Sequence, residues 1–117
     1  MKTVNDDIYS LLNSTGYSVN AYDSNVKDGD SVNYVLIPES SDGIKEQYRL
    51  EITVIAFDFI TGMKMLDDVK KALITVGDTP KTDVILSIAL NGGGNLVNYE
   101  THTHHLKAYF NILAKAR

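Results

Sequence analysis

Cysteine is absent from the 117-residue sequence. Its absence excludes thiol catalysis, disulfide bonds and every zinc site that uses thiolate ligands. It also favours a reducing, intracellular setting, because small secreted domains often depend on disulfides. Long apolar runs are missing too, and the first residues lack the apolar centre of a signal peptide. We therefore expect a protein that is made in the cytoplasm and has no membrane partner.

Basic charge is scarce. The 11 Lys and Arg residues are scattered and stand against 15 Asp and Glu, which gives a net charge of −4. Nucleic-acid binders generally concentrate basic side chains in a stripe that neutralises phosphates. The sequence therefore argues against specific binding of DNA or RNA. Hydrophobic residues make up 44% of the chain, an ordinary globular value, and the length predicts one domain over residues 1–117.

Two segments show the periodicity of amphipathic helices. From Val4 to Thr15 apolar residues recur on one face, two aspartates stand in the first turn, and Gly16 supplies a stop signal. The second helix is predicted over Met63–Val76, with Gly77 as its cap.

Strands are predicted between and after these helices. Alternating apolar residues make Gln47–Asp58 the clearest strand. Asn33–Pro38 is predicted as another strand, which Pro38 ends by removing a backbone donor, and Glu39–Gly43 follows as a polar loop. A short strand near Tyr17–Tyr22 fits the alternation there.

The last third of the sequence predicts a hairpin. Val84–Leu90 alternates as one strand, and the three glycines of Asn91–Asn95 form the bend. The final strand covers Leu106–Lys115, with a bulge or break expected near Thr101–His104. The whole order predicts an α+β fold in which a mostly antiparallel sheet carries two packed helices and ends in a C-terminal β-hairpin.

The histidines near residue 103 are the first candidate for chemistry. His102 and His104 are two residues apart on a predicted strand, so they point to one face and together offer two metal ligands. Glu100 is the one nearby third ligand, and a closed ligand set is missing. We expect no resident metal and no cofactor. A small metal- or ligand-binding protein that uses His102 and His104 remains the alternative from a different functional class.

Other polar motifs do not assemble into a catalytic site. The glycines of Asn91–Asn95 are not followed by a helix or a Lys-Ser/Thr pair, which favours a flexible hairpin tip over a phosphate loop. Asp67 and Asp68 diverge by about 100° on a helix. Asp28 and Asp30 lie in a predicted turn, where such side chains bond their own backbone. We therefore predict no catalytic residue and no enzyme.

The order of elements gives a resemblance. It runs from Tyr34–Pro38 through a polar loop to Tyr48–Phe57, the helix Met63–Val76 and a hairpin ending in Leu106–Leu113. This order resembles that of the tail-terminator and tail-completion proteins of long-tailed bacteriophages. The resemblance implies a homohexameric ring, located at the tail or neck of the virion, that caps the tail tube and joins it to the head. It also implies a tail-tube protein and a head-completion protein as partners, with a head-to-tail connector as the alternative role.

Such a ring encloses a channel for DNA, and a negatively charged lumen lets DNA pass without specific binding. The predicted sheet also suggests where subunits meet, because its second face is not cleanly polar and only the N-terminal helix is left to cover it. Large apolar patches on monomers are rare, so this face is expected to contact a neighbouring subunit unless that helix covers it. The expected interface residues are Ile55, Phe57, Tyr109, Leu113, Gly92, Gly93 and Gly94.

Overall fold

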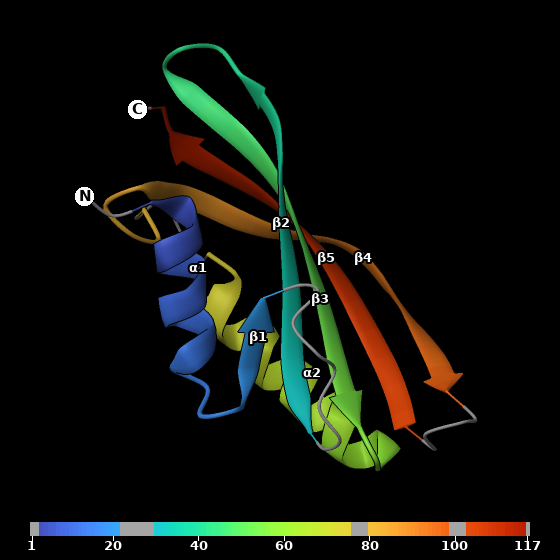
Figure 1. Ribbon diagram of the computed structural model, residues 1–117. Helices are drawn as coiled ribbons and strands as arrows, with labels where there is room; N and C mark the ends of the chain where they lie inside the picture. The colour runs from blue at the N-terminus through green and yellow to red at the C-terminus, as the bar shows by residue number, and fades with distance from the viewer. Residues whose placement is uncertain (1–2, 22–29, 76–79, 99–102, 117) are drawn as a thin grey trace.

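A computed structural model describes residues 3–21, 30–75, 80–98 and 103–116 (Figure 1). The elements follow the order α1 (Val4–Asn13), β1 (Val19–Ala21), β2 (Ser31–Ser41), β3 (Lys45–Ala56), α2 (Phe59–Leu73), β4 (Ile85–Asn98) and β5 (Thr103–Lys115). The strands form one sheet in the order β1-β2-β3-β5-β4. β1 pairs with β2 in parallel and the other three pairings are antiparallel. The predicted α+β class and the C-terminal hairpin of β4 and β5 are confirmed.

Both helices pack on the same face of the sheet (Figure 1). The apolar sides of α1 and α2 meet the alternate residues of β2, β3 and β5 in one cluster, and Tyr34 of β2 donates a hydrogen bond to Asn5 of α1 at 3.1 Å. α1 therefore does not cover the opposite face. The fully buried members of this core include Ile8, Leu12, Leu50, Ile52, Val54, Val69, Leu73, Phe110 and Ile112.

α1 begins where the sequence predicts. Thr3 and Asp6 form a capping box, in which Asp6 N donates to Thr3 Oγ1 at 3.1 Å and Thr3 N donates to Asp6 Oδ2 at 3.0 Å. The helix ends at Asn13, and Gly16 takes a positive φ of 84° just beyond it. This confirms the predicted stop.

α2 begins four residues before the predicted Met63, because Asp58 caps it by accepting hydrogen bonds from Thr61 N at 3.1 Å and Thr61 Oγ1 at 3.0 Å. Gly62 therefore lies inside the helix rather than in a turn. A Cβ there would stand 2.7 Å from Leu106 Cδ1, so the glycine lets α2 approach the sheet closely. The helix also ends earlier than predicted, at Leu73. Residues 76–79, including the predicted cap, lie outside the described residues.

Pro38 does not end β2, contrary to the prediction. It pairs with Tyr48 on β3, and the strand continues to Ser41 after a register shift between Pro38 and Ser40. In the described part of the chain β1 pairs only with residues 32–34 of β2, so Pro38 lies on an open edge, where a missing N–H is tolerated. The predicted loop at Glu39–Gly43 shrinks to a short turn at residues 42–44.

The glycine segment Asn91–Asn95 is not the hairpin bend that the sequence predicts. It lies within β4, where the register shifts between Leu90, opposite Phe110, and Gly93, opposite Ala108. A Cβ on Gly93 would lie 2.6 Å from the backbone oxygen of Lys107, so this position of the strand accommodates only glycine without a shift. The chain instead reverses between Asn98 and Thr103, which pair with each other. The predicted break near Thr101–His104 falls partly outside the described residues.

Candidate interaction surface

The histidines do not form a metal site in the described part of the chain. No group of three His, Asp or Glu residues with metal-binding geometry occurs there, and His102 lies outside it. His104 packs edge-on against Phe59 with ring centroids 5.5 Å apart, and its buried Nδ1 has no hydrogen-bond partner. His105 points to the opposite face, where burial lowers the pKa of its imidazole. The two described histidines therefore cannot share a ligand.

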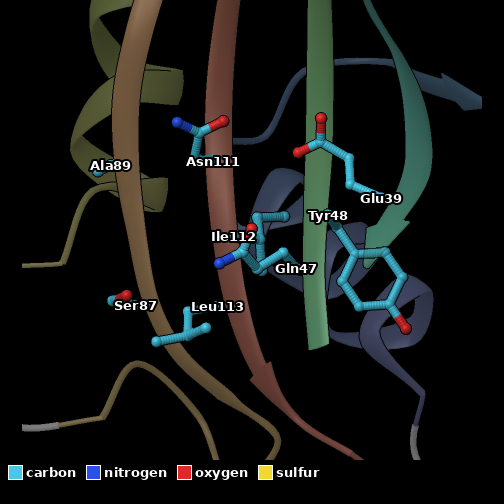
Figure 2. Close-up of a pocket in the computed structure, with 8 residues that line it drawn as sticks. All are labelled: Glu39, Gln47, Tyr48, Ser87, Ala89, Asn111, Ile112 and Leu113. Carbon is cyan, nitrogen blue, oxygen red and sulfur yellow. The ribbon is translucent and has the colours of Figure 1, made fainter. Parts of the chain in front are cut away.

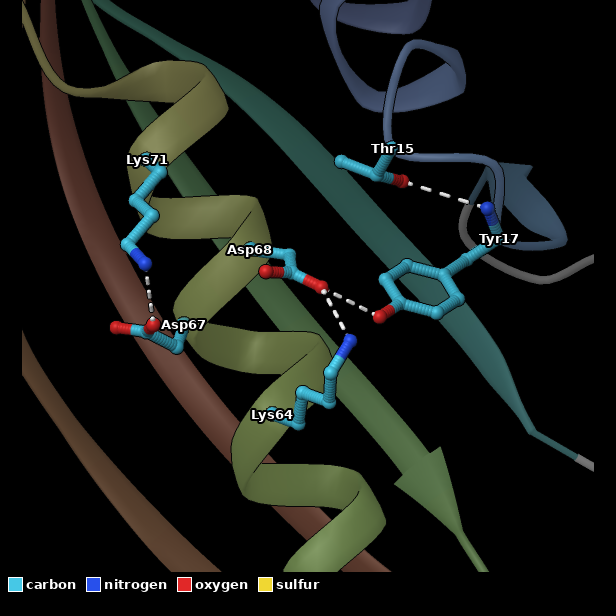
Figure 3. A network of polar contacts seen from close by, with 6 residues as sticks. All are labelled: Thr15, Tyr17, Lys64, Asp67, Asp68 and Lys71. Carbon is cyan, nitrogen blue, oxygen red and sulfur yellow. Dashed lines mark hydrogen bonds and ion pairs between the residues drawn. The ribbon is translucent and has the colours of Figure 1, made fainter.

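Asp67 and Asp68 serve two separate contacts (Figure 3). Asp67 pairs with Lys71 at 3.1 Å, and Asp68 pairs with Lys64 at 3.5 Å. Tyr17, from the segment between α1 and β1, donates a hydrogen bond to Asp68 Oδ2 at 2.6 Å. That bond raises the pKa of Tyr17 and lowers the pKa of Asp68. Asp68 therefore fastens the connecting segment to α2, whereas Asp67 pairs within the helix, and the two carboxylates do not converge.

The sheet face opposite the helices, which we call the open face, is a mixed surface. On it the guanidinium of Arg49 lies 4.8 Å from the ring centroid of Tyr109, a cation–π contact, and Arg49 Nε is buried without a hydrogen-bond partner. No described helix packs on this face. By strand register its residues include Asn33, Val35, Ile37, Gln47, Arg49, Glu51, Thr53, Ile55, Lys107, Tyr109, Asn111 and Leu113.

A shallow groove of about 440 Å³ crosses the sheet at one end (Figure 2). Its lining comes from β2, β3, β4 and β5, and Glu39 is its one ionisable group apart from Tyr48. A single carboxylate beside amides and aliphatic side chains supplies no pair of carboxyl groups for acid–base chemistry. The lining residues are Glu39, Gln47, Tyr48, Ser87, Ala89, Asn111, Ile112 and Leu113.

The predicted interface residues fall into four groups. Tyr109 and Leu113 lie half-buried on the open face. Ile55 points to the same face but is 3% exposed, so its side chain packs inside the subunit. Phe57 follows β3 and is 54% exposed. The glycines Gly92, Gly93 and Gly94 belong to the irregular stretch of β4.

Two exposed apolar patches lie at opposite ends of β3. The first, which we call the α2-start patch, contains Phe57, Ile60 and Met63, of which Ile60 is 70% exposed. The second, the hairpin tip, is Ile44 in the turn between β2 and β3, which is 75% exposed, whereas Ile37 lies on the open face opposite Arg49. The sequence reasoning found only Phe57 among these. The spacing of three residues in the α2-start patch is a readable signal, but the late predicted start of the helix concealed it.

The comparisons with known proteins concern the fold. The sequence matches no protein-family profile and no curated protein. A solved structure described as "Virion of native gene transfer agent (GTA) particle" contains a chain with the same fold, with a TM-score of 0.67 and 13% identity. The match covers 93% of this chain and 92% of the other. The likeness therefore extends over nearly all of both chains.

No described helix is long and apolar enough to span a membrane.

Proposed function

We propose that this protein is a non-enzymatic structural component of a phage-like virion, and that it forms a ring that caps the tail tube and joins it to the head. The observation that carries the proposal is the fold, which nearly the whole chain shares with a chain of a gene transfer agent particle.

The surface supports an assembly role. The groove on the open face contains one carboxylate, Glu39, and among the described residues no group of three His, Asp or Glu side chains could hold a metal ion. Instead, none of the described helices covers the open face, and exposed apolar side chains lie near both ends of β3. Exposed apolar patches of this kind mark surfaces that bind other proteins.

The first test is the oligomeric state. Purified protein is expected to form a closed ring of six subunits, visible by negative-stain electron microscopy and by light scattering during gel filtration. Mass spectrometry should also detect the protein in purified particles. A protein that stays monomeric at every concentration and is missing from the particles would refute the proposal.

The second test separates the tail terminator from the head-to-tail connector. A tail terminator should remain on tails that assemble without heads, whereas a connector should remain on heads that assemble without tails. Antibody labelling of lysates from a mutant that makes no heads and from a mutant that makes no tails distinguishes these roles.

The alternative of a metal-binding protein predicts about one equivalent of zinc or nickel per chain of untagged protein, which elemental analysis measures.

A further inference from the structure

The irregular stretch of β4 contains Asn91, the one asparagine of the sequence that is followed directly by a glycine. The register of β4 shifts between Leu90 and Gly93, so two residues, Asn91 and Gly92, lie opposite the single residue Tyr109 of β5. Such a bulge leaves the extra residue unpaired and disrupts the ladder locally. β4 is also an outermost strand of the sheet, so no described strand holds this stretch from the other side.

The side chain of Asn91 is exposed and only weakly held. Its Nδ2 donates a hydrogen bond to Asn111 Oδ1 at 3.5 Å, which is longer than the usual range for such a bond. Gly92 is exposed as well and has a positive φ of 110°. Because glycine has no side chain and a wide range of backbone angles, the approach of its nitrogen to Cγ of Asn91 meets little steric resistance.

Asn111 provides a contrast within the same pair of side chains. It is also exposed, but the next residue, Ile112, is 1% exposed and lies opposite Tyr48 on β3 and Ile88 on β4. The peptide after Asn111 is therefore held by strands on both sides, and the stiff, β-branched side chain of Ile112 restricts the approach of its nitrogen to the amide. Of these two exposed asparagines, Asn91 is the one that precedes a peptide outside the regular ladder.

We propose that Asn91 is a site of spontaneous deamidation in the folded subunit. The backbone nitrogen of Gly92 attacks Cγ of Asn91, and the attack is favoured because the two groups are adjacent in one chain. A bond forms between Gly92 N and Asn91 Cγ as the bond from Cγ to Nδ2 breaks. The departing nitrogen takes up the proton of the backbone amide and leaves as ammonia, and a five-membered succinimide remains.

Water completes the reaction by opening the succinimide ring. Its addition at Cγ restores the main chain and gives aspartate, whereas its addition at the main-chain carbonyl of Asn91 gives isoaspartate, in which the main chain runs through the side chain. The net change is one water consumed and one ammonia released, so the reaction needs no oxidant, reductant or further reactant.

The reaction changes the open face. A carboxylate only accepts hydrogen bonds, so the product loses the donation to Asn111, a residue that lines the groove (Figure 2). Each reacted subunit gains one negative charge, and isoaspartate also lengthens the main chain of β4 by one methylene. The change falls beside Gly92, one of the residues that the sequence predicts at a subunit interface. The chemistry requires only the bulge, so it is independent of the ring proposed above.

The test follows the side-chain amide of Asn91 in folded wild-type protein that is incubated at mildly alkaline pH, which promotes loss of the proton from the attacking nitrogen. Isoelectric focusing should show a growing band shifted by one negative charge, while the circular dichroism spectrum stays unchanged. Mass spectrometry of fragmented tryptic peptides should locate the loss of the amide at position 91 and find Asn111 intact in the same sample. In water enriched in heavy oxygen the product should carry the label, because water opens the succinimide. A sample digested at the start corrects for reaction during digestion.

Asn91→Gln is the control, since glutamine keeps the amide but requires a six-membered ring, which closes much more slowly. This variant should fold like wild type, because the position is exposed, and should form no acidic band over the same period. Wild-type protein unfolded in urea gives the rate of the reaction without the fold.

Each other outcome overturns the proposal. If the amide of Asn91 survives in the folded protein, the proposal is wrong, and its loss in urea alone would show that β4 blocks the attack. Equal loss at Asn91 and Asn111, or earlier loss at any other asparagine, would show that the bulge does not select the site. An acidic band from Asn91→Gln would place the reaction at another residue.

Discussion

The two faces of the sheet differ in residue type and in burial although they are built from the same strands. On the face under the helices, alternate residues of β3 and β5 are apolar and almost completely buried. On the open face the same strands carry charged, amide and aromatic residues that are half-buried. The difference indicates that the helix-covered face holds the subunit together, whereas no described helix covers the open face.

The largest expected effect is on the helix-covered face. Phe110 is fully buried and lies opposite Leu50 and Leu90 on the neighbouring strands. Phe110→Ala should reduce the free energy of unfolding by about 3–5 kcal/mol, because it leaves a cavity in the core. Tyr109→Ala, one residue away on the open face, should cost about 1 kcal/mol through the lost contact with Arg49. Urea unfolding followed by circular dichroism compares the two, and equal losses would mean that the open face is as tightly packed as the core.

A second comparison divides the open face itself. Ile55 points to this face but is 3% exposed, whereas Leu113 is half-buried beside the groove. Ile55→Lys should destabilise the subunit by about 3 kcal/mol or more, because it buries an unpaired charge. Leu113→Lys should leave the subunit folded and weaken self-association, which sedimentation velocity measures. A stable Ile55→Lys variant would show that a lysine at this position reaches solvent.

The irregular stretch of β4 gives a smaller effect. A Cβ at position 93 would meet the backbone oxygen of Lys107, which cannot rotate away. Gly93→Ala should therefore lower the free energy of unfolding by about 1–3 kcal/mol as β4 shifts away from β5. Asn91→Ala, at an exposed position two residues earlier, is the control and should change stability little. If Gly93→Ala had the same free energy of unfolding as wild type, β4 would be able to shift away from β5 without cost.

The smallest effect concerns the contact between Tyr17 and α2. Tyr17→Phe removes the hydrogen bond to Asp68 and should lower the melting temperature by no more than about 4 °C at neutral pH. The bond holds the pKa of Asp68 below its ordinary value, so its stabilisation is present above pH about 4 and is lost as the pH falls through the folded-state pKa. The difference between wild type and variant should therefore disappear in acid. A difference that persists there would implicate ring packing rather than the carboxylate.

The sequence predicted the elements whose formation depends on residues close together in the chain. α1 has a capping box and β3 has clean alternation, and both lie within a few residues of their predicted bounds. The start of α2 was missed because a Thr-Gly pair is typical of a turn, and only the contact with Leu106 explains why glycine is inside the helix. The glycines of β4 were misread for the same reason, since the crowding comes from Lys107, a residue distant in sequence.

The candidate surface was predicted less completely than the fold. The sequence located Tyr109 and Leu113 on the correct face, because strand alternation decides that. It missed the hairpin tip, because Pro38 was expected to end β2 before the strand extends to the turn. Exposure depends on what the rest of the chain covers, so no sequence pattern around Ile44 indicates that this side chain faces solvent.

Two interruptions, one in the part of β2 that β1 leaves uncovered and one in β4, have a consequence for solubility. Pro38 lacks the N–H that a further strand would need on the side of β2, and β4 loses its regular register between Leu90 and Gly93 on the other side. A regular, unbroken edge is a template on which identical chains stack into fibres. Both edges here are interrupted near their middle. These interruptions hinder open-ended polymerisation of the subunit through its edges.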